Sequence, residues 1–393
     1  MTYPTKVAWI FLLGFALDLV NMFVATVAYP EIARELHASV TQLAWISNAY
    51  MLGLTLIIPL SVWLAAIMGE RRLIGASLLL FAGASLMVGQ ATSIQALISW
   101  RVVQGLGGGL LIPVGQAMAY RHFPASERSH LTARVMSVAL LVPALSPALG
   151  GLIVDSVSWR WIFYANLPLA LFTLLLAMLW IKPDVPASVR PGLDLVGIFD
   201  QARSSMLRLA MLVYLFIPGV FIGTSLIAIL YLRGLGYDAT RTGALMLPWA
   251  LASALAIFLS KKLFNRCGPK PLLLAGMALQ CIGILLLNTA LIIPAYLLMG
   301  LGGSLCSSTA QTLAFLDIRA ERMGHASALW NINRQISFCL GAAVLSALLS
   351  ALDSFAITFT IAAALTLLPL FAVLRLDASR VRTLLHPASE PHP

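Results

Sequence analysis

Charged residues are scarce in this sequence. Asp, Glu, Lys and Arg make up 10% of the 393 residues, whereas a soluble domain is about one quarter charged. Hydrophobic residues account for 60%, and the mean hydropathy is +0.92. A chain with so little charge could not cover its surface with polar groups in water. The sequence therefore predicts an all-α membrane protein, and its long unbroken apolar runs exclude the short alternating strands of a membrane β-barrel.

Cysteine and the common catalytic motifs are also scarce. The chain has four cysteines, three of them inside apolar runs, and their spacing does not match a metal site. No phosphate-binding loop, nucleophile elbow or mid-span histidine appears in the sequence. We therefore expect no enzyme activity, no metal and no cofactor, with a proton gradient as the energy source.

Twelve apolar runs are long enough to cross a membrane, since a helix needs about 20 residues to do so. They cover residues 7–30, 42–68, 73–92, 95–120, 133–154, 160–181, 207–232, 241–260, 271–290, 293–316, 326–350 and 355–376. The one long polar gap separates the sixth run from the seventh. The sequence thus predicts an N-terminal six-helix bundle at 1–182, a cytoplasmic linker at 183–206, a C-terminal six-helix bundle at 207–376 and a cytoplasmic tail at 377–393.

The distribution of Lys and Arg predicts the orientation. With the N-terminus inside, 19 of the 25 basic residues fall in inner segments and four in outer segments. Cytoplasmic loops carry such an excess. We therefore expect a multi-pass protein of the cytoplasmic (inner) membrane with both termini in the cytoplasm. The formal net charge of +10 then reflects orientation rather than nucleic-acid binding.

The two halves repeat one another weakly. Gly105-Leu-Gly-Gly-Gly-Leu in the fourth run matches Gly300-Leu-Gly-Gly-Ser-Leu in the tenth, and Gln116 matches Gln311 at the same offset. Two pseudo-symmetric six-helix halves are typical of secondary transporters, whose substrate site lies near the midplane between the repeats. Glycines in such runs let neighbouring helices approach closely.

Five stretches form recognisable motifs: SVWLAAIMGERR (61–72), WRVVQGLGGG (100–109), VPALSPALGG (142–151), SWRWIFYANLP (158–168) and NINRQISFCLGAA (331–343). Together they resemble the major facilitator superfamily, specifically its drug:proton antiporter branch, and the first three are similar to its motifs A, B and C. The resemblance implies the twelve-helix major facilitator fold and gating roles for residues in the motif A loops and motif C. These residues are Gly69, Arg71, Arg72, Pro143, Pro147, Gly150, Gly151 and Arg266.

The chain also departs from the family pattern. Ala66 and Ile67 stand where motif A normally has an aspartate and a basic residue, and Asn265 stands where the second-half copy often has an aspartate. In the first run, the family's acidic position falls on Asn21, and the acid present is Asp18. The standard gate is therefore altered.

Asp18 is the one acid deep inside a predicted span. At ~1.5 Å per residue it lies roughly 16 Å from the inner end of that span, near mid-membrane. Burial favours the neutral form of a carboxyl group, and a nearby cation favours the ionised form. We therefore expect Asp18 and the motif B residue Arg101 to couple protons to transport. A purely structural acid and a purely structural arginine are the alternatives.

Other polar and aromatic residues are candidates for the substrate site. Asn21 and Gln104 should lie at a similar depth, and they can form one polar cluster with Arg101 if the first and fourth spans are neighbours, as the family fold implies. Arg334 with Asn331 belongs to a second polar patch, for which two interpretations stay open: binding of an anionic substrate group, or capping of a helix interface. The predicted substrate-binding residues are Asn21, Met22, Tyr50, Gln104, Gln311, Trp330, Asn331 and Arg334.

Together these features predict a proton-coupled secondary transporter that exports amphipathic small molecules or drugs by alternating access. Its partners would be a small-molecule substrate, protons and the lipid bilayer, with no nucleic acid and with a monomer expected. Two alternatives stay open: a dedicated metabolite or siderophore carrier, and a membrane receptor or scaffold that no longer transports.

Overall fold

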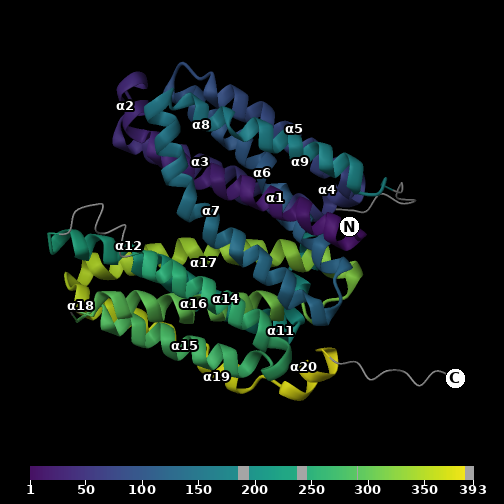
Figure 1. Ribbon diagram of the computed structural model, residues 1–393, viewed down its shortest axis with the longest axis vertical. Helices are drawn as coiled ribbons and strands as arrows, with labels where there is room; N and C mark the ends of the chain where they lie inside the picture. Colours follow the sequence, from purple (N-terminus) through teal and green to yellow (C-terminus); the bar gives the residue numbers. More distant parts are fainter. Residues whose placement is uncertain (185–193, 237–245, 290, 386–393) are drawn as a thin grey trace. The chain divides into compact units, whose positions relative to one another are not determined.

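The structure is a computed structural model that describes residues 1–184, 194–236, 246–289 and 291–385. These residues form helices and turns and contain no strand (Figure 1). The middle of the predicted linker, at 185–193, and the end of the predicted tail, at 386–393, lie outside the described residues.

The predicted spans correspond to helices or to pairs of helices. Those up to residue 180 are α1 (Tyr3–Val24), α2 (Tyr29–Leu36), α3 (Val40–Ile57), α4 (Ser61–Met68), α5 (Glu70–Gly89), α6 (Ile94–His122), α7 (Arg128–Ser156), α8 (Arg160–Tyr164) and α9 (Asn166–Trp180). The later ones are α10 (Leu195–Asp200), α11 (Ser205–Phe216), α12 (Pro218–Gly234), α14 (Met246–Cys267), α15 (Pro269–Leu286), α16 (Ile292–Ala314), α17 (Met323–Leu352), α18 (Phe355–Leu365), α19 (Leu370–Leu374) and α20 (Ala378–Leu385).

Two predicted spans are interrupted at proline. The second divides into α3 and α4 at a short 3-10 turn, Ile58–Leu60, that contains Pro59. The seventh divides where α11 ends at Phe216 and α12 begins at Pro218. Proline lacks the N–H that would continue the helical hydrogen bonds, which favours a break at these two positions.

Eleven helical segments among the described residues are long and apolar enough to cross a membrane. The predicted fifth span, at 133–154, lies on the 29-residue helix α7, some of whose side chains are not described. An all-helical architecture with long apolar segments therefore agrees with the sequence-based prediction.

The chain forms two compact units. The first unit comprises Met1–Phe123, Val138–Gln201 and Arg319–Ile332, and the second comprises Pro124–Ser137, Ala202–Ile318 and Asn333–Pro393. This grouping follows spatial packing and includes short exchanged segments at the starts of α7 and α17. The sequence limits 1–182 and 207–376 for the two repeats remain a prediction.

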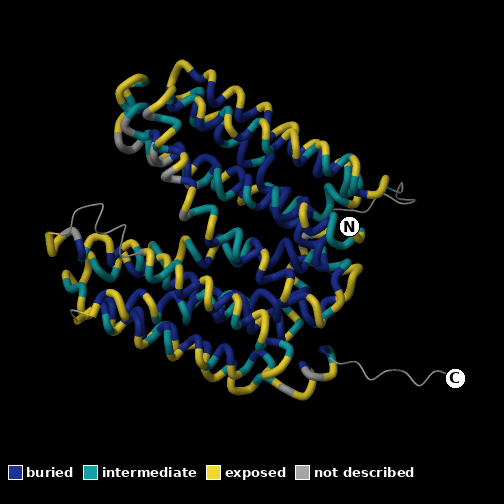
Figure 2. Tube along the Cα trace, in the orientation of Figure 1, coloured by how far each residue is buried: buried dark blue, intermediate teal, exposed yellow. Residues whose placement is uncertain are grey.

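A glycine-bearing helix lies at the centre of each unit. In the first unit α6 packs against α1, α3 and α5, and in the second α16 packs against α11, α14 and α15. Figure 2 shows that buried residues follow the inner faces of these helices, with exposed residues on the outer faces. The two central helices carry the glycine motifs that the sequence repeats.

The repeated glycines occupy matching close contacts. A Cβ added to Gly105 would lie 2.1 Å from the backbone oxygen of Tyr50 on α3, and one added to Gly300 would lie 2.4 Å from that of Trp249 on α14. Neither backbone could accommodate a side chain at that distance. The predicted role of these glycines in close helix packing is thus confirmed at both copies.

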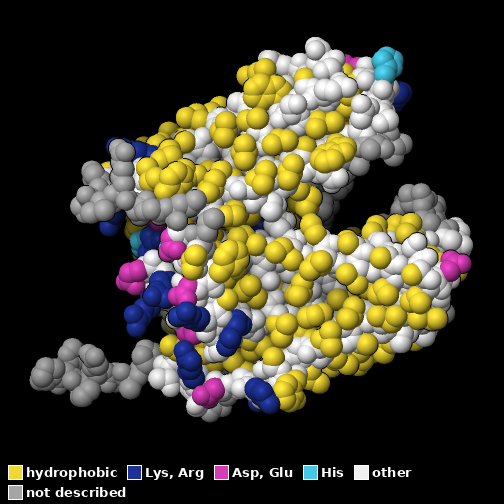
Figure 3. All heavy atoms as spheres, turned by 180° about the vertical axis from the view of Figure 1, so that it is seen from behind, with side chains coloured by type: hydrophobic (Ala, Val, Ile, Leu, Met, Phe, Trp, Pro, Cys, Tyr) yellow, Lys and Arg dark blue, Asp and Glu magenta, His cyan; other side chains and the backbone are white. Residues whose placement is uncertain are grey.

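The surface is mainly apolar along the helices. On the face shown in Figure 3, hydrophobic side chains cover both units, and the Lys and Arg side chains of the second unit gather at the end that carries α20. Many outward-facing side chains are large and apolar, among them Leu251 and Leu179. Such a surface is stable against lipid tails and unstable in water.

Candidate proton-coupling site

A buried carboxylate and a tyrosine form the centre of the candidate site. Asp18 on α1 is 3% exposed, and Tyr50 on α3 is fully buried. The Tyr50 hydroxyl donates a hydrogen bond to Oδ1 of Asp18. An ionised carboxylate in a low-dielectric interior is costly unless donors or cations stabilise it, so this bond is a principal support of the charged form.

Arg101 lies over the aromatic ring of Tyr50. Its side chain on α6 is fully buried, and its guanidinium carbon lies 4.5 Å from the centroid of the Tyr50 ring and 5.7 Å from that of Phe163. Its Nε donates to the backbone oxygen of Ile46 at 3.0 Å. The cation is thus held by an aromatic face and a carbonyl dipole. Tyr50 links Asp18 and Arg101, because its hydroxyl contacts one and its ring the other.

A chain of hydrogen bonds continues from Arg101 into the first unit. Arg101 Nη1 donates to Gln104 Oε1 at 2.7 Å, and Gln104 Nε2 donates to Asn21 Oδ1 at 3.1 Å and to Ser85 Oγ at 2.6 Å. Asn166 Nδ2 on α9 also donates to Asn21 Oδ1, at 3.1 Å. Buried polar networks of this kind fix one arrangement of side chains, because each unmade bond is costly.

Helical spacing explains why these residues meet. Asp18 and Asn21 are three residues apart on α1, and Arg101 and Gln104 are three apart on α6, so each pair shares one helix face. Gly108, one turn further along α6, leaves room for Asp18 and Tyr50: a Cβ there would lie 2.6 Å from the Tyr50 hydroxyl. The glycine motif therefore shapes the site as well as the helix contact.

Two buried donors in this network have no acceptor among the described residues. They are Asn21 Nδ2 and Arg101 Nη2. An unpaired buried N–H group costs about 1–3 kcal/mol. Both groups are therefore available to an acceptor such as a water molecule or a carbonyl group.

A second polar cluster joins α6 to the start of α17 within the first unit. Asn331 Nδ2 donates to Gln116 Oε1 at 2.7 Å, and the Ser327 hydroxyl donates to the same oxygen at 2.9 Å and to the Pro113 carbonyl at 2.8 Å. All three side chains are buried. Asn331, a predicted substrate residue, is thus held by protein partners.

The remaining predicted substrate residues lie on three helices. Met22 on α1 and Arg334 on α17 are half-buried, whereas Gln311 on α16 and Trp330 on α17 are buried. Their part in substrate binding stays a prediction.

The loop before α5 has a carboxylate partner that the sequence reasoning did not identify. Gly69 adopts a positive φ of 85° between α4 and α5. The Asp184 side chain accepts hydrogen bonds at 3.0 Å from the backbone N–H groups of Arg71 and Arg72, at the N-terminus of α5. The Arg71 guanidinium donates to the Met178 carbonyl. A carboxylate at this position interacts favourably with the helix dipole.

Motif C residues lie along α7. Gly150 is buried, and a Cβ there would lie 2.6 Å from Cγ2 of Val24 at the end of α1, while Pro143 and Gly151 are half-buried. The side chain of Pro147 is outside the described set. The observed close contact concerns α7 and α1, and a gating role for these residues stays a prediction. Arg266 lies exposed at the end of α14.

A second acid, Asp317, lies just after the end of α16 and has a structural environment. The Ser204 hydroxyl donates to its Oδ1 at 2.9 Å and its Oδ2 at 3.2 Å, and Arg380 on α20 forms an ion pair with its Oδ2 at 3.3 Å. It therefore ties the start of α11 and the C-terminal helix to the end of α16.

Trp159 and Arg160, in the motif at 158–168, both contact Glu35 on α2. Trp159 Nε1 donates to Glu35 Oε2 at 2.7 Å, and Arg160 pairs with Glu35 Oε1 at 2.5 Å while its guanidinium carbon lies 4.3 Å from the Trp159 ring centroid. The Trp159 hydrogen bond, together with the nearby Arg160, holds the pKa of Glu35 below its usual value. The motif thus fastens α2 to α8.

Sequence reasoning missed part of the network. The sequence predicts that Asn21, Gln104 and Arg101 lie together, and the structure brings these three residues into one network. Tyr50 is predicted only as a substrate-binding residue, and Ser85 has no predicted role. Asn166 belongs to the motif at 158–168, and its place there could have suggested a functional role. No feature of the sequence distinguishes Ser85, because isolated serines are common in membrane helices.

These observations define a class of protein. A membrane-embedded helical protein with two related glycine-centred units and a buried polar network around a carboxylate has the architecture of a secondary transporter.

The chain belongs to the Major Facilitator Superfamily, whose family model matches residues 11–342. It is 27% identical to the putative multidrug resistance protein MdtD of Cronobacter sakazakii, over 87% of this chain and 86% of that protein. It is 28% identical to the multidrug resistance protein Stp of Mycobacterium tuberculosis, over 86% of this chain and 74% of that protein. The multidrug export protein EmrB of Escherichia coli is 32% identical over 46% of this chain and 36% of its own length.

Solved structures show the same fold. The human organic anion transporter MFSD10 superposes with a TM-score of 0.78 at 17% identity, over 95% of this chain and 100% of that one. The transporter FucP gives a TM-score of 0.74 at 16% identity, over 96% and 100%. The predicted family and fold class are therefore confirmed, and the protein is a transporter.

Proposed function

We propose that this transporter exports amphipathic small molecules in exchange for protons. Two observations support the proposal. The relatives MdtD and Stp, which match 87% and 86% of this chain, are named as multidrug resistance proteins, and Asp18 is a buried carboxylate that accepts a hydrogen bond from Tyr50. The proposed mechanism rests on the buried Asp18 carboxylate and its hydrogen bond from Tyr50.

The Asp18–Tyr50–Arg101 arrangement can act as a proton-dependent switch. When Asp18 is ionised, it accepts a charge-assisted hydrogen bond from Tyr50, and the Arg101 cation over the same ring stabilises the negative charge nearby. When Asp18 is protonated, that bond weakens and the hold on the Tyr50 hydroxyl is reduced. Tyr50 and Arg101 are then free to change partners.

The network transmits this change to other helices. Arg101 contacts Gln104, which in turn bonds to Asn21 and Ser85, so five helices of the first unit are connected to the state of one carboxylate. In the proposed cycle, protonation favours one facing state of the transporter and substrate favours the other. Linkage requires the two effects to be reciprocal: a substrate that promotes proton release must bind less tightly when Asp18 is protonated.

The proposed substrate-binding residues are Asn21, Met22, Tyr50, Gln104, Gln311, Trp330, Asn331 and Arg334. The free donors of Asn21 and Arg101 suit an acceptor group on the substrate. We further propose that the protein resides in the inner membrane as a monomer, with both termini cytoplasmic and with no nucleic-acid partner.

The test is transport in proteoliposomes that contain the purified full-length protein and a pH-sensitive dye inside. A fluorescent amphipathic cation and a fluorescent amphipathic anion should be tried separately, because the site holds both an acid and an arginine. Addition of a substrate should move protons in the opposite direction, at a rate well above that of vesicles without protein.

Other results would point to the alternatives. Substrate movement without proton movement would favour a carrier that is not proton-coupled, such as one for a metabolite. Binding without movement of either species would favour a receptor or scaffold.

A further inference from the structure

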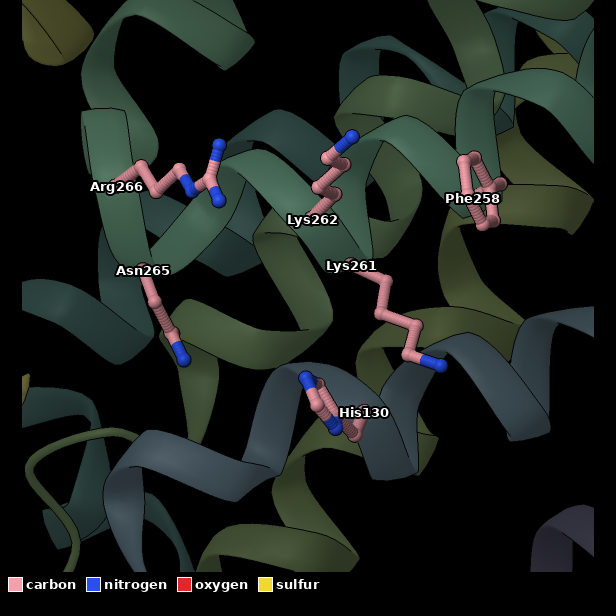
Figure 4. A pocket seen from close by; sticks show the side chains of 6 residues that line it. All are labelled: His130, Phe258, Lys261, Lys262, Asn265 and Arg266. Atoms are coloured by element: carbon pink, nitrogen blue, oxygen red, sulfur yellow. The ribbon is translucent and has the colours of Figure 1, made fainter.

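An open cavity of about 310 Å³ lies at the end of α14, within the second unit. Its lining residues are His130, Phe258, Lys261, Lys262, Asn265 and Arg266. Figure 4 shows that His130 comes from α7 and the others from α14, with Lys261 extending toward the helix of His130. Neither the proton-coupling network nor the proposed substrate residues reach this cavity.

The cavity is strongly basic. Lys261, Lys262 and Arg266 are exposed, and no acidic side chain lines the cavity among the described residues. Glu127 and Arg134, on the same segment as His130, also act on its charge. The net effect of burial and of the neighbouring Lys261 is a lowered pKa for His130, which keeps the ring neutral and able to donate a hydrogen bond near neutral pH.

Asn265 supplies an unused acceptor to this wall. Its Nδ2 donates to the Ser126 carbonyl at 2.6 Å, while its buried Oδ1 has no partner among the described residues. A carboxylate at this position would have neutralised part of the cavity. With asparagine there, three basic side chains line the cavity without a carboxylate, and Asn265 Oδ1 can accept a hydrogen bond from a ligand hydroxyl group.

An apolar stripe leads along α14 to the cavity. Leu247, Leu251, Leu255 and Phe258 are all exposed, and their spacing of four, four and three residues places them on one helix face. Phe258 belongs to both the stripe and the cavity wall. A ligand that filled the cavity could therefore extend an apolar tail along the helix toward the membrane interior.

We propose that this cavity binds the phosphate headgroup of an anionic phospholipid, with an acyl chain on the α14 stripe. Clusters of basic residues at the cytoplasmic ends of membrane helices attract anionic lipids of that leaflet. The headgroup phosphate pairs with Lys261, Lys262 and Arg266, and a headgroup hydroxyl, as in phosphatidylglycerol, donates to Asn265 Oδ1. A free phosphate ion would satisfy the charges but would leave the stripe unused.

The test uses the purified full-length protein in detergent and native mass spectrometry with phosphatidylglycerol or phosphatidylcholine of the same acyl chains. The wild type should bind phosphatidylglycerol more tightly. Each lysine contributes about 5-fold in affinity, so Lys261→Gln/Lys262→Gln should weaken phosphatidylglycerol binding by roughly 25-fold. Arg208→Gln, an exposed basic residue of α11 outside the cavity, is the matched control and should bind as the wild type does.

Two further measurements separate the possible ligands. Phe258→Asn should weaken phosphatidylglycerol binding, and inorganic phosphate at millimolar concentration should displace the lipid only weakly. Equal affinity for the two lipids, wild-type affinity in the double lysine variant with an unchanged thermal midpoint, or complete displacement by inorganic phosphate would each overturn the proposal.

Discussion

Removing the Tyr50 hydroxyl should make Asp18 hold its proton more tightly. Tyr50→Phe keeps the aromatic ring under Arg101, so the cation–π contact at 4.5 Å remains while the bond to Asp18 Oδ1 is lost. A hydrogen bond to a charged group contributes about 1.5–3 kcal/mol. Since ~1.36 kcal/mol corresponds to one pH unit, the midpoint of proton-coupled transport should rise by about 1–2 pH units.

The assay is the pH dependence of substrate flux in proteoliposomes, measured for the wild type and Tyr50→Phe. Tyr296→Phe is the matched control, because Tyr296 is equally buried and its hydroxyl has no partner among the described residues. The control should keep the wild-type midpoint. An unchanged midpoint in Tyr50→Phe, or a shift to lower pH, would refute the assigned role of the hydroxyl.

Three predictions concern the scaffold, and thermal midpoints in detergent test each of them. Gly105→Ala should lower the free energy of unfolding by about 1–3 kcal/mol, because the new Cβ would lie 2.1 Å from a backbone oxygen. Gly83→Ala should leave the free energy of unfolding unchanged, because a Cβ at that position has nothing within 4 Å. Asp184→Ala should cost about 1 kcal/mol through the lost helix cap, and an unchanged midpoint would argue against the cap. The lowered pKa of Glu35 means that its contact with Trp159 stabilises the fold above the usual glutamate pKa and is lost as pH falls through the lowered one. Glu35→Gln should therefore flatten the dependence of the thermal midpoint on pH in the acid range, and a dependence equal to that of the wild type would contradict this.

Much of the fold follows from the sequence, since apolar runs of about 20 residues leave a chain few choices other than membrane helices. The repeated glycines at Gly105 and Gly300 predicted close helix contact, and the structure places both on the helix that packs against most of its neighbours in each unit. The breaks at Pro59 and Pro218 were not predicted, although proline was the visible cause.

The site was less predictable. Asp18 and Arg101 are conspicuous because charge is costly in a membrane, so any buried charge suggests a function. Tyr50 carries no charge, and a tyrosine in an apolar span gives no sign of whether it faces lipid, cavity or carboxylate. Asp184 lies in a polar stretch after α9, and its contact with the start of α5 depends on a chain reversal that local sequence does not specify.

The central claim is that Asp18 releases a proton when substrate binds. The most direct measurement is isothermal calorimetry of substrate binding to the purified protein in buffers of different ionisation enthalpy, for the wild type and Asp18→Asn. We predict that the wild type releases protons on binding near neutral pH, while Asp18→Asn binds the substrate and releases none. Equal proton release by both proteins would contradict the account, because the titrating group would then lie elsewhere.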